Sequence, residues 1–224
     1  PPSVTRTINQ IVEHTVERVV PAVVPATQGA SAAAAVSTKE TTIVVKDEDL
    51  VAQSIAKAQR SVIRIVSKNA PDQLLARGVI ISEEGVAISD RGTLEPMGTL
   101  NFEAILPTGD RVSAVMRVPS GTTTIAVLDL GVASSSGKFA ASAFADTSKL
   151  RLGQSVIRIG GTGTDTVGTG VIAKLPEAHG SLIQASVVST TPGSLLTTSF
   201  GEIIGLITTD SAAYGPDFYT LPNP

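Results

Sequence analysis

The chain has 224 residues and a formal net charge of −3, a balance that favours neither nucleic acid nor an anionic membrane as a partner. It contains no cysteine and no tryptophan, which excludes disulfides, thiol chemistry and zinc sites built on thiolates. No run of about eighteen apolar residues predicts a membrane-spanning helix. The chain begins at Pro1-Pro2 rather than at methionine, and we expect a processed or cropped N-terminus that leaves an upstream signal or anchor out of view.

The first element is an N-terminal arm with an apolar stripe. Seven β-branched residues recur at a spacing that includes three- and four-residue steps, as on one side of a helix: Val4, Ile8, Ile11, Val12, Val16, Val19 and Val20. The same residue types favour strands, so an amphipathic helix and an extended strand both remain open. Pro21 and Pro25 end either element. A stripe of this size predicts that the arm packs against its own domain or against a neighbouring subunit.

A linker and a short helix follow the arm. Residues 26–38 are small and featureless and are typical of a linker. Residues 41–45 read TTIVV, which is a short strand signal. Asp47 or Asp49 could cap a helix that runs to about Gln59.

From Ser61 the pattern changes to short apolar or alternating runs that Gly, Pro, Asp or Ser usually separate. The runs occupy residues 61–68, 76–82, 85–90, 101–107, 111–118, 124–131, 155–161, 168–175, 182–188 and 202–209. Glu84-Gly85 and Thr108-Gly109-Asp110 are typical of hairpin turns. Many short strands with turn signals and no long helix between them predict an all-β barrel or sandwich. A parallel α/β sheet is not expected.

The order of these runs resembles the protease domain of HtrA-like proteins, members of the trypsin-like (chymotrypsin-fold) superfamily. Residues 75–94 are similar to the strands that lead into the family's catalytic-histidine loop, and residues 122–130 to the strand that opens with the catalytic aspartate. Residues 192–208 resemble the nucleophile loop and the strand after it. The resemblance covers about Val51 to Thr209 and implies two six-stranded antiparallel β-barrels packed side by side.

All three catalytic positions depart from the family's pattern. The resemblance places Gly92 at or next to the histidine position, Thr124 at the aspartate and Ser194 at the nucleophile. The loop Pro192-Gly193-Ser194-Leu195-Leu196 lacks the Gly-Gly that follows the family's serine and shapes its oxyanion hole. The comparison therefore implies a pseudoprotease with a degenerate triad and no catalytic residue, in which Ser194 is a turn residue.

Two other side-chain types could supply the missing base. The chain's histidines are His14 in the arm and His179 in a loop between strands, and Lys149 or Lys174 could form a Ser-Lys dyad. The simpler interpretation of all four is a solvated surface side chain. The glycine-rich residues 160–170 precede a strand rather than a helix, so they do not predict a phosphate-binding loop. We predict no cofactor and no metal site.

Three functions remain open from the sequence. The first is a non-catalytic protein for structural assembly or binding at the cell surface, whose arm docks between subunits into a homopolymer or filament. The alternatives are an active secreted serine endopeptidase with an unorthodox site and a tethered binding module that uses the arm as a spacer. We favour the first and expect a bacterial, extracellular or cell-surface protein. Residues 1–46 are then the arm and linker, and residues 47–224 the double-barrel domain, without the family's PDZ domains.

Overall fold

The structure, a computed structural model, describes residues 47–118, 123–131, 138–177 and 180–222. From Leu50 onward these residues belong to one compact unit. The arm with its apolar stripe, the strand signal at 41–45, His14 and His179 all lie outside the described residues. No helix within the described ranges is long and apolar enough to cross a membrane.

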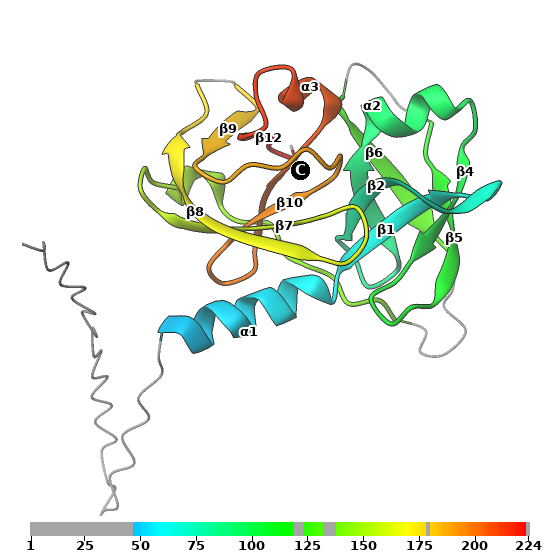
Figure 1. The fold of residues 1–224 in the computed structure, drawn as a ribbon, viewed down its shortest axis with the longest axis horizontal. Coiled ribbons are helices and arrows are strands. Elements are labelled where there is room, and N and C mark those ends of the chain that lie inside the picture. Colours follow the sequence, from blue (N-terminus) through cyan, green and yellow to red (C-terminus); the bar gives the residue numbers. More distant parts are fainter. Residues whose placement is uncertain (1–46, 119–122, 132–137, 178–179, 223–224) are drawn as a thin grey trace, which may run out of the picture. The chain divides into compact units, whose positions relative to one another are not determined.

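Helix α1, Asp47–Gln59, confirms the predicted short helix (Figure 1). Val51 and Ile55 pack against an apolar cluster that both barrels share. Ser54 donates a hydrogen bond from Oγ to the carbonyl of Ser199, in the turn after β10 (Leu195–Thr198). The helix that leads the chain into the first barrel is therefore fixed to the second one.

The first barrel is antiparallel and closed. Its strands are β1 (Val62–Ser67), β2 (Ala70–Ile80), β3 (Val86–Asp90), β4 (Asn101–Ile105), β5 (Arg111–Met116) and β6 (Ile125–Leu130), in the order β1-β2-β3-β6-β5-β4. Along β5 exposed and buried residues alternate, because successive side chains of a strand point to opposite faces. Both predicted hairpin turns are present, and Gly85 and Gly109 supply their positive φ angles of 96° and 91°.

The second barrel has the same strand number and confirms the prediction of two six-stranded antiparallel barrels. Its strands are β7 (Ser155–Gly160), β8 (Thr166–Lys174), β9 (Leu182–Ala185), β10, β11 (Ile203–Leu206) and β12 (Phe218–Thr220), in the order β10-β11-β12-β9-β8-β7. Two strands were not foreseen. The residues of β10, LLTT, resemble part of a nucleophile loop, and β12 is three residues long and lies beyond the expected end at Thr209.

Short helices connect the strands, and an apolar cluster joins the barrels. The helices are α2 (Arg91–Leu94), η1 (Glu95–Met97), η2 (Thr147–Lys149) and α3 (Thr209–Ala212). The cluster includes Val79 and Ile88 of the first barrel and Ile159, Leu195 and Leu206 of the second. Burial of such side chains is worth about 1.5–3 kcal/mol each before chain entropy is subtracted. This contact brings the predicted catalytic positions to one interface.

Candidate functional site

Ser194 lies just before β10, and its side chain is completely buried. Its Oγ atom accepts a hydrogen bond of 2.8 Å from the Ser189 hydroxyl. The same oxygen lies against Gly160 of β7, where a Cβ atom would come within 2.5 Å of it. The predicted nucleophile position therefore has a hydroxyl partner and no access to solvent.

The backbone around Ser194 is also engaged. The amide of Gly193 donates to Ile207 O at 2.7 Å, and the amide of Ser194 donates to Thr191 O at 3.1 Å. The amide of Ile207 donates in return to Ser194 O at 2.9 Å. An oxyanion hole needs amide groups that remain free to receive developing negative charge. The amides of Gly193 and Ser194 are not free, because both already donate within the fold.

Gly193 is clamped against the first barrel. Its φ of 73° lies in the left-handed region, and its Cα approaches the carbonyl of Arg77 so closely that no side chain fits. The amide of Arg77 donates to Pro192 O at 2.8 Å. Glycine is thus required at position 193 by close contact with β2 as well as by the turn itself.

The Arg77 side chain is a second link across the interface, and sequence reasoning missed it. Arg77 is 1% exposed and donates from Nε to Gly161 O at 2.6 Å and from Nη1 to Asp165 Oδ1 at 2.7 Å. The other oxygen of Asp165 accepts a hydrogen bond of 2.9 Å from Gln59 Nε2 at the end of α1. We call Arg77, Asp165 and Gln59 the Arg77 clasp. It holds the loop between β7 and β8 against the first barrel.

Asp90 forms a third link, also missed. It is fully buried at the end of β3, where Oδ1 accepts from the amides of Gly92 at 3.2 Å and Thr209 at 3.0 Å. Its Oδ2 accepts from the Thr209 hydroxyl at 2.7 Å and the Thr93 amide at 3.1 Å. Asp90 therefore caps α2 and at the same time ties it to α3 of the second barrel.

Gly92, the residue that the sequence resemblance matches to the histidine, lies directly against Thr209. A Cβ atom at Gly92 would be 2.6 Å from both Cβ and Oγ1 of Thr209. Cβ atoms do not approach other heavy atoms this closely, so any side chain at position 92 requires Thr209 to move. Because Asp90 holds Thr209 by two hydrogen bonds, such a movement also breaks the tie between α2 and α3.

Thr124, the residue that the sequence resemblance matches to the aspartate, is half-buried just before β6. Its carbonyl accepts a hydrogen bond of 3.1 Å from the amide of Arg91, the residue next to Gly92. The Arg91 guanidinium binds both carboxylate oxygens of Glu95 at 3.0 Å. This hydrogen bonding raises the pKa of Arg91 and lowers the pKa of the Glu95 carboxyl. Gly92 and Thr124 are thus on adjoining segments.

The lysines considered as alternative bases are exposed and bound to carboxylates. Lys149 pairs with Asp146 at 2.9 Å and Lys174 with Glu177 at 2.8 Å. Hydrogen bonding to Asp146 raises the pKa of Lys149, so its neutral form becomes scarcer at neutral pH. Neither lysine has a hydrogen bond to Ser194 in the described parts of the chain.

In the sequence, His179 comes five residues after Lys174, the last residue of β8. Thr166, at the near end, pairs with Gly160 beside Ser194, whereas Lys174 ends the strand eight residues later. A strand of that length spans up to about 26 Å. The residues that flank His179, Glu177 and Gly180, follow this far end. His179 and His14 lie outside the described residues, so the prediction that both are solvated surface side chains rather than bases stays untested.

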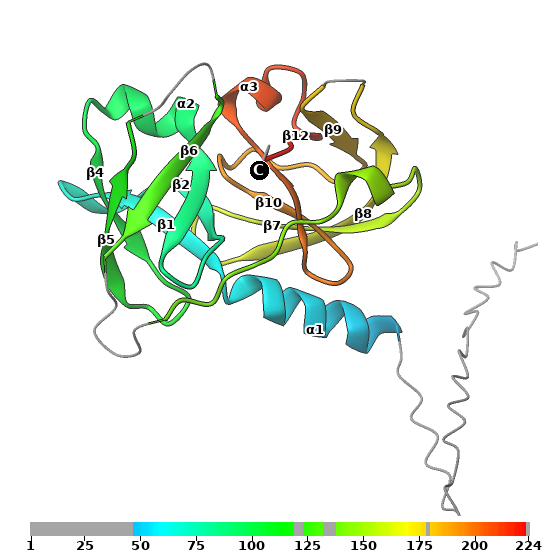
Figure 2. The same cartoon turned by 180° about the vertical axis from the view of Figure 1, so that it is seen from behind.

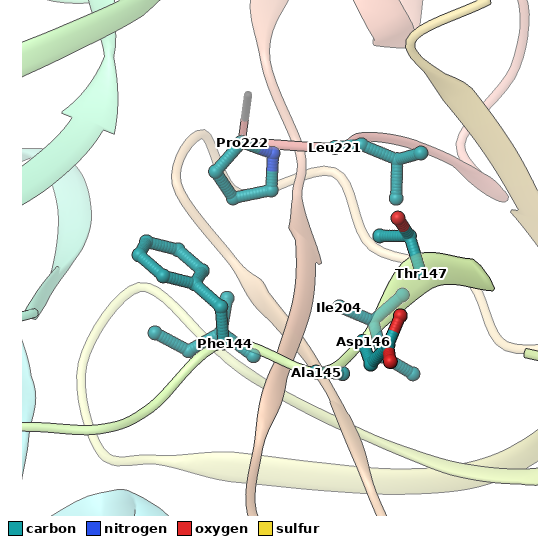
Figure 3. Close-up of a pocket in the computed structure, with 8 residues that line it drawn as sticks. Phe144, Ala145, Asp146, Thr147, Ile204, Leu221 and Pro222 are labelled. Atoms are coloured by element: carbon teal, nitrogen blue, oxygen red, sulfur yellow. The ribbon is translucent and has the colours of Figure 1, made fainter. Parts of the chain in front are cut away.

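A pocket of about 240 Å³ lies elsewhere on the second barrel (Figure 3). It is lined by Phe144, Ala145, Asp146, Thr147, Ile203, Ile204, Leu221 and Pro222. Its one carboxylate is engaged, because Asp146 accepts from the Ser148 hydroxyl at 2.6 Å and pairs with Lys149. These interactions lower the pKa of Asp146 to about 2. None of the predicted catalytic positions lines this pocket.

The comparisons with known proteins bear on the fold. No family model matches the chain, and no curated protein matches it. Among solved structures, the chain is similar to one described as an HtrA-type protease AlgW with decapeptide, with a TM-score of 0.63 and 18% sequence identity over 77% of this chain. The chain covers 64% of that protein, a little under two thirds of its length. The likeness shows that this chain has the trypsin-like double-barrel fold.

Proposed function

We propose that this chain is a trypsin-like double-barrel protein without peptidase activity, which serves structural assembly or binding at the cell surface through its N-terminal arm. The observation that carries the non-catalytic part is the bonding of Ser194. Its Oγ is completely buried, accepts a hydrogen bond from the Ser189 hydroxyl and lies against Gly160. A serine nucleophile needs an exposed oxygen, a base within hydrogen-bond reach and free oxyanion donors.

The rest of the interface supports the same conclusion. The amides of Gly193 and Ser194 are already bound, and the space beside Gly92 is filled by Thr209. The three departures are independent, so a single substitution does not restore a triad. Restoring histidine at Gly92 together with aspartate at Thr124 still leaves the serine buried and the oxyanion donors occupied.

The assembly part of the proposal rests on the apolar stripe of the arm and on the linker that follows it. Seven β-branched apolar side chains between Val4 and Val20 are a large apolar surface for a free tail. Burying each is worth roughly 1.5–3 kcal/mol, before the entropy of ordering the arm is subtracted. The Ala/Ser-rich composition of residues 26–38 is typical of linkers, and a linker of this length would let the arm reach another subunit. A cell-surface location remains part of this proposal.

The catalytic part is tested by turnover of casein and of short ester substrates. We expect no activity above background from the wild-type chain, from Ser194→Ala, or from the double variant Gly92→His/Thr124→Asp. Turnover that disappears in Ser194→Ala would falsify the non-catalytic part and revive the secreted endopeptidase.

The assembly part is tested by light scattering across concentration. We expect the wild-type chain to associate and the triple variant Ile8→Ser/Val12→Ser/Val16→Ser to remain smaller, because the stripe loses its apolar side chains. The matched control is Thr7→Ser/Asn9→Ser/Thr15→Ser, which changes the polar positions of the same arm and should associate like wild type. A wild-type chain that is monomeric at every concentration contradicts assembly and favours the spacer interpretation.

A further inference from the structure

Strand β8 is paired along only part of its length on one side (Figure 2). It pairs with β7 from Thr166 to Val171, but with β9 only at Ile172 and Lys174. The first half of β8 is therefore a sheet edge within an otherwise closed barrel.

The backbone groups on this edge can be identified from the bonding of their neighbours. Ile172 faces the β7 side, where its amide donates to Gln154 O at 2.9 Å. Val171 faces the opposite side, where its carbonyl accepts from the Ser186 amide at 2.8 Å and its amide donates to Ser186 Oγ at 2.9 Å. Directions alternate along an antiparallel strand. Val167 and Thr169 therefore direct their amides and carbonyls away from β7, where they have no hydrogen-bond partner among the described residues.

The edge is open because the chain after β9 turns inward. Beyond Ser186, Val187 leaves the ladder and becomes part of the core of the second barrel. It passes over Gly168 and Gly170, where Cβ atoms would lie 2.7 Å from Val187 Cγ2 and 3.1 Å from Val187 Cβ. The two glycines make room for Val187, and the ladder position beside Thr169 is left unfilled.

The side chains of the edge are suited to strand addition. Val167 and Val171 are 40% and 39% exposed, and Thr169 between them is exposed as well. Natural sheet edges are usually protected by charged residues, proline or a covering segment. Residues 167–171 read VGTGV and contain neither a charge nor a proline. An extended chain can therefore pair here without meeting a repulsive group.

We propose that the free edge of β8, residues 167–169, receives the N-terminal arm of a second copy of this chain as an added strand. The inference rests on the proposed assembly function and deepens it by naming the acceptor. In an extended arm, Val4, Ile8, Val12 and Val16 all fall on one face, because side chains alternate. Such a strand presents β-branched side chains to a β-branched edge, the pairing that sheets favour.

The dimensions also favour a contact between copies. The stretch from Val4 to Val20 is about 50 Å long when extended, whereas the free edge is about 10 Å long. One edge does not bury the whole stripe, and the edge of another copy can receive the remainder. Residues 25–46 separate the stripe from α1, and a flexible chain of that length would have a root-mean-square span of about 26 Å.

Disulfide trapping tests the acceptor directly, since the chain has no native cysteine. Arm variants Ile8→Cys, Val12→Cys and Val16→Cys, which together sample the register, are each mixed with Val167→Cys and oxidised. We expect a mixed dimer with at least one of them. The matched control is Val115→Cys on β5, because Val115 is 42% exposed and also lies on a strand. Equal trapping with the control overturns the proposal.

A lysine substitution on the β8 edge tests the acceptor site separately from the proposed assembly function, on which this inference rests. We expect Val167→Lys to shift the wild-type assembly towards monomer in light scattering, and Val115→Lys to leave it unchanged. If Val167→Lys assembles like wild type while the triple arm variant does not, the acceptor is wrong and the assembly function stands. If the wild-type chain never associates, both fail. A Val12→Cys/Val167→Cys chain that crosslinks only within itself overturns docking between copies.

Discussion

Strands β8 and β10 lie on either side of β7 (Figures 1 and 2). They differ in how completely their polar groups are hydrogen-bonded. On one side, at the start of β10, Ser194 is buried, and its hydroxyl, amide and carbonyl all have partners. On the other side, Val167 and Thr169 of β8 have exposed side chains, and their backbone groups that face away from β7 have no partner in the described part of the chain. Catalysis would need the Ser194 hydroxyl to be accessible, but it is buried and hydrogen-bonded. The β8 edge, which catalysis does not use, is accessible. The contrast supports our proposal of a non-catalytic protein that binds other copies of its chain.

The largest expected effect on stability comes from breaking the Arg77 clasp, which links the two barrels. Arg77→Ala should lower the free energy of unfolding by about 3 kcal/mol, because it breaks a buried ion pair and leaves Asp165 without its main partner. The measurement is chemical denaturation.

The control for that variant is Arg117→Ala. Arg117 also binds both oxygens of an aspartate, Asp129, but the two side chains are 53% and 52% exposed. Solvent and salt screen such a pair, so we expect no measurable change in stability. Equal losses from the two variants would show that the clasp does not hold the interface.

The next effect concerns Asp90. Asp90→Ala should cost about 2–3 kcal/mol, because the amides of Gly92, Thr93 and Thr209 lose their acceptor in a buried site. Thermal unfolding measures the loss. Asp110→Ala, at an exposed turn, is the control and should be close to wild type. An unchanged melting temperature for Asp90→Ala would mean that this tie contributes little to the interface.

A smaller effect tests the contact between Gly92 and Thr209. Gly92→Ala should destabilise the fold by about 1–3 kcal/mol, because the new Cβ overlaps with Thr209. Thr209→Ala in the same chain removes two of the overlapping atoms and should recover part of the loss in a double-mutant cycle. Additive losses would indicate that Gly92 is required for another reason.

The smallest expected effect on stability concerns Tyr219, which contacts Val187 beside the β8 edge. Tyr219 donates a hydrogen bond of 2.8 Å to Val187 O, which helps to hold Val187 over the β8 glycines. Burial raises the pKa of Tyr219 well above its ordinary value of 10. The neutral form is therefore favoured in the folded state, and its stabilising contribution is complete below about pH 10 and is lost as the pH rises further.

The variant Tyr219→Phe should lose about 1 kcal/mol at neutral pH, where the hydrogen bond is missing. Between pH 10 and 12 its free energy of unfolding should fall less steeply than that of the wild type. Tyr214→Phe is the control, since Tyr214 is 70% exposed. An alkaline profile of Tyr219→Phe that runs parallel to the wild type would contradict this origin of the pH dependence.

The sequence predicts most of the fold because strand signals are local. Ten apolar runs, two hairpin turns and the helix that ends at Gln59 all follow from residues close together in the chain. Strand β10 was misassigned because its residues carry both a strand pattern and the resemblance to a nucleophile loop. Strand β12 is too short to produce a signal.

The sequence marks Arg77 and Asp90 as unusual residues, but it does not reveal which residues they bind. Arg77 interrupts the apolar run of β2, and Asp90 ends β3, so each is a charged residue in a place where burial is expected. Their partners lie far away, since Arg77 reaches Asp165 across 88 positions and Asp90 reaches Thr209 across 119. Only the packing of the two barrels brings these groups together.

The central claim is that the chain cannot use Ser194 as a nucleophile, and a fluorophosphonate probe tests it most directly. Wild-type and Ser194→Ala chains are incubated with the probe, and labelled peptides are mapped by mass spectrometry, with trypsin as the positive control. The account predicts no adduct on Ser194 and identical patterns for the two chains, because the hydroxyl is buried and bound to Ser189. A stoichiometric adduct on Ser194 that is absent from Ser194→Ala would contradict it.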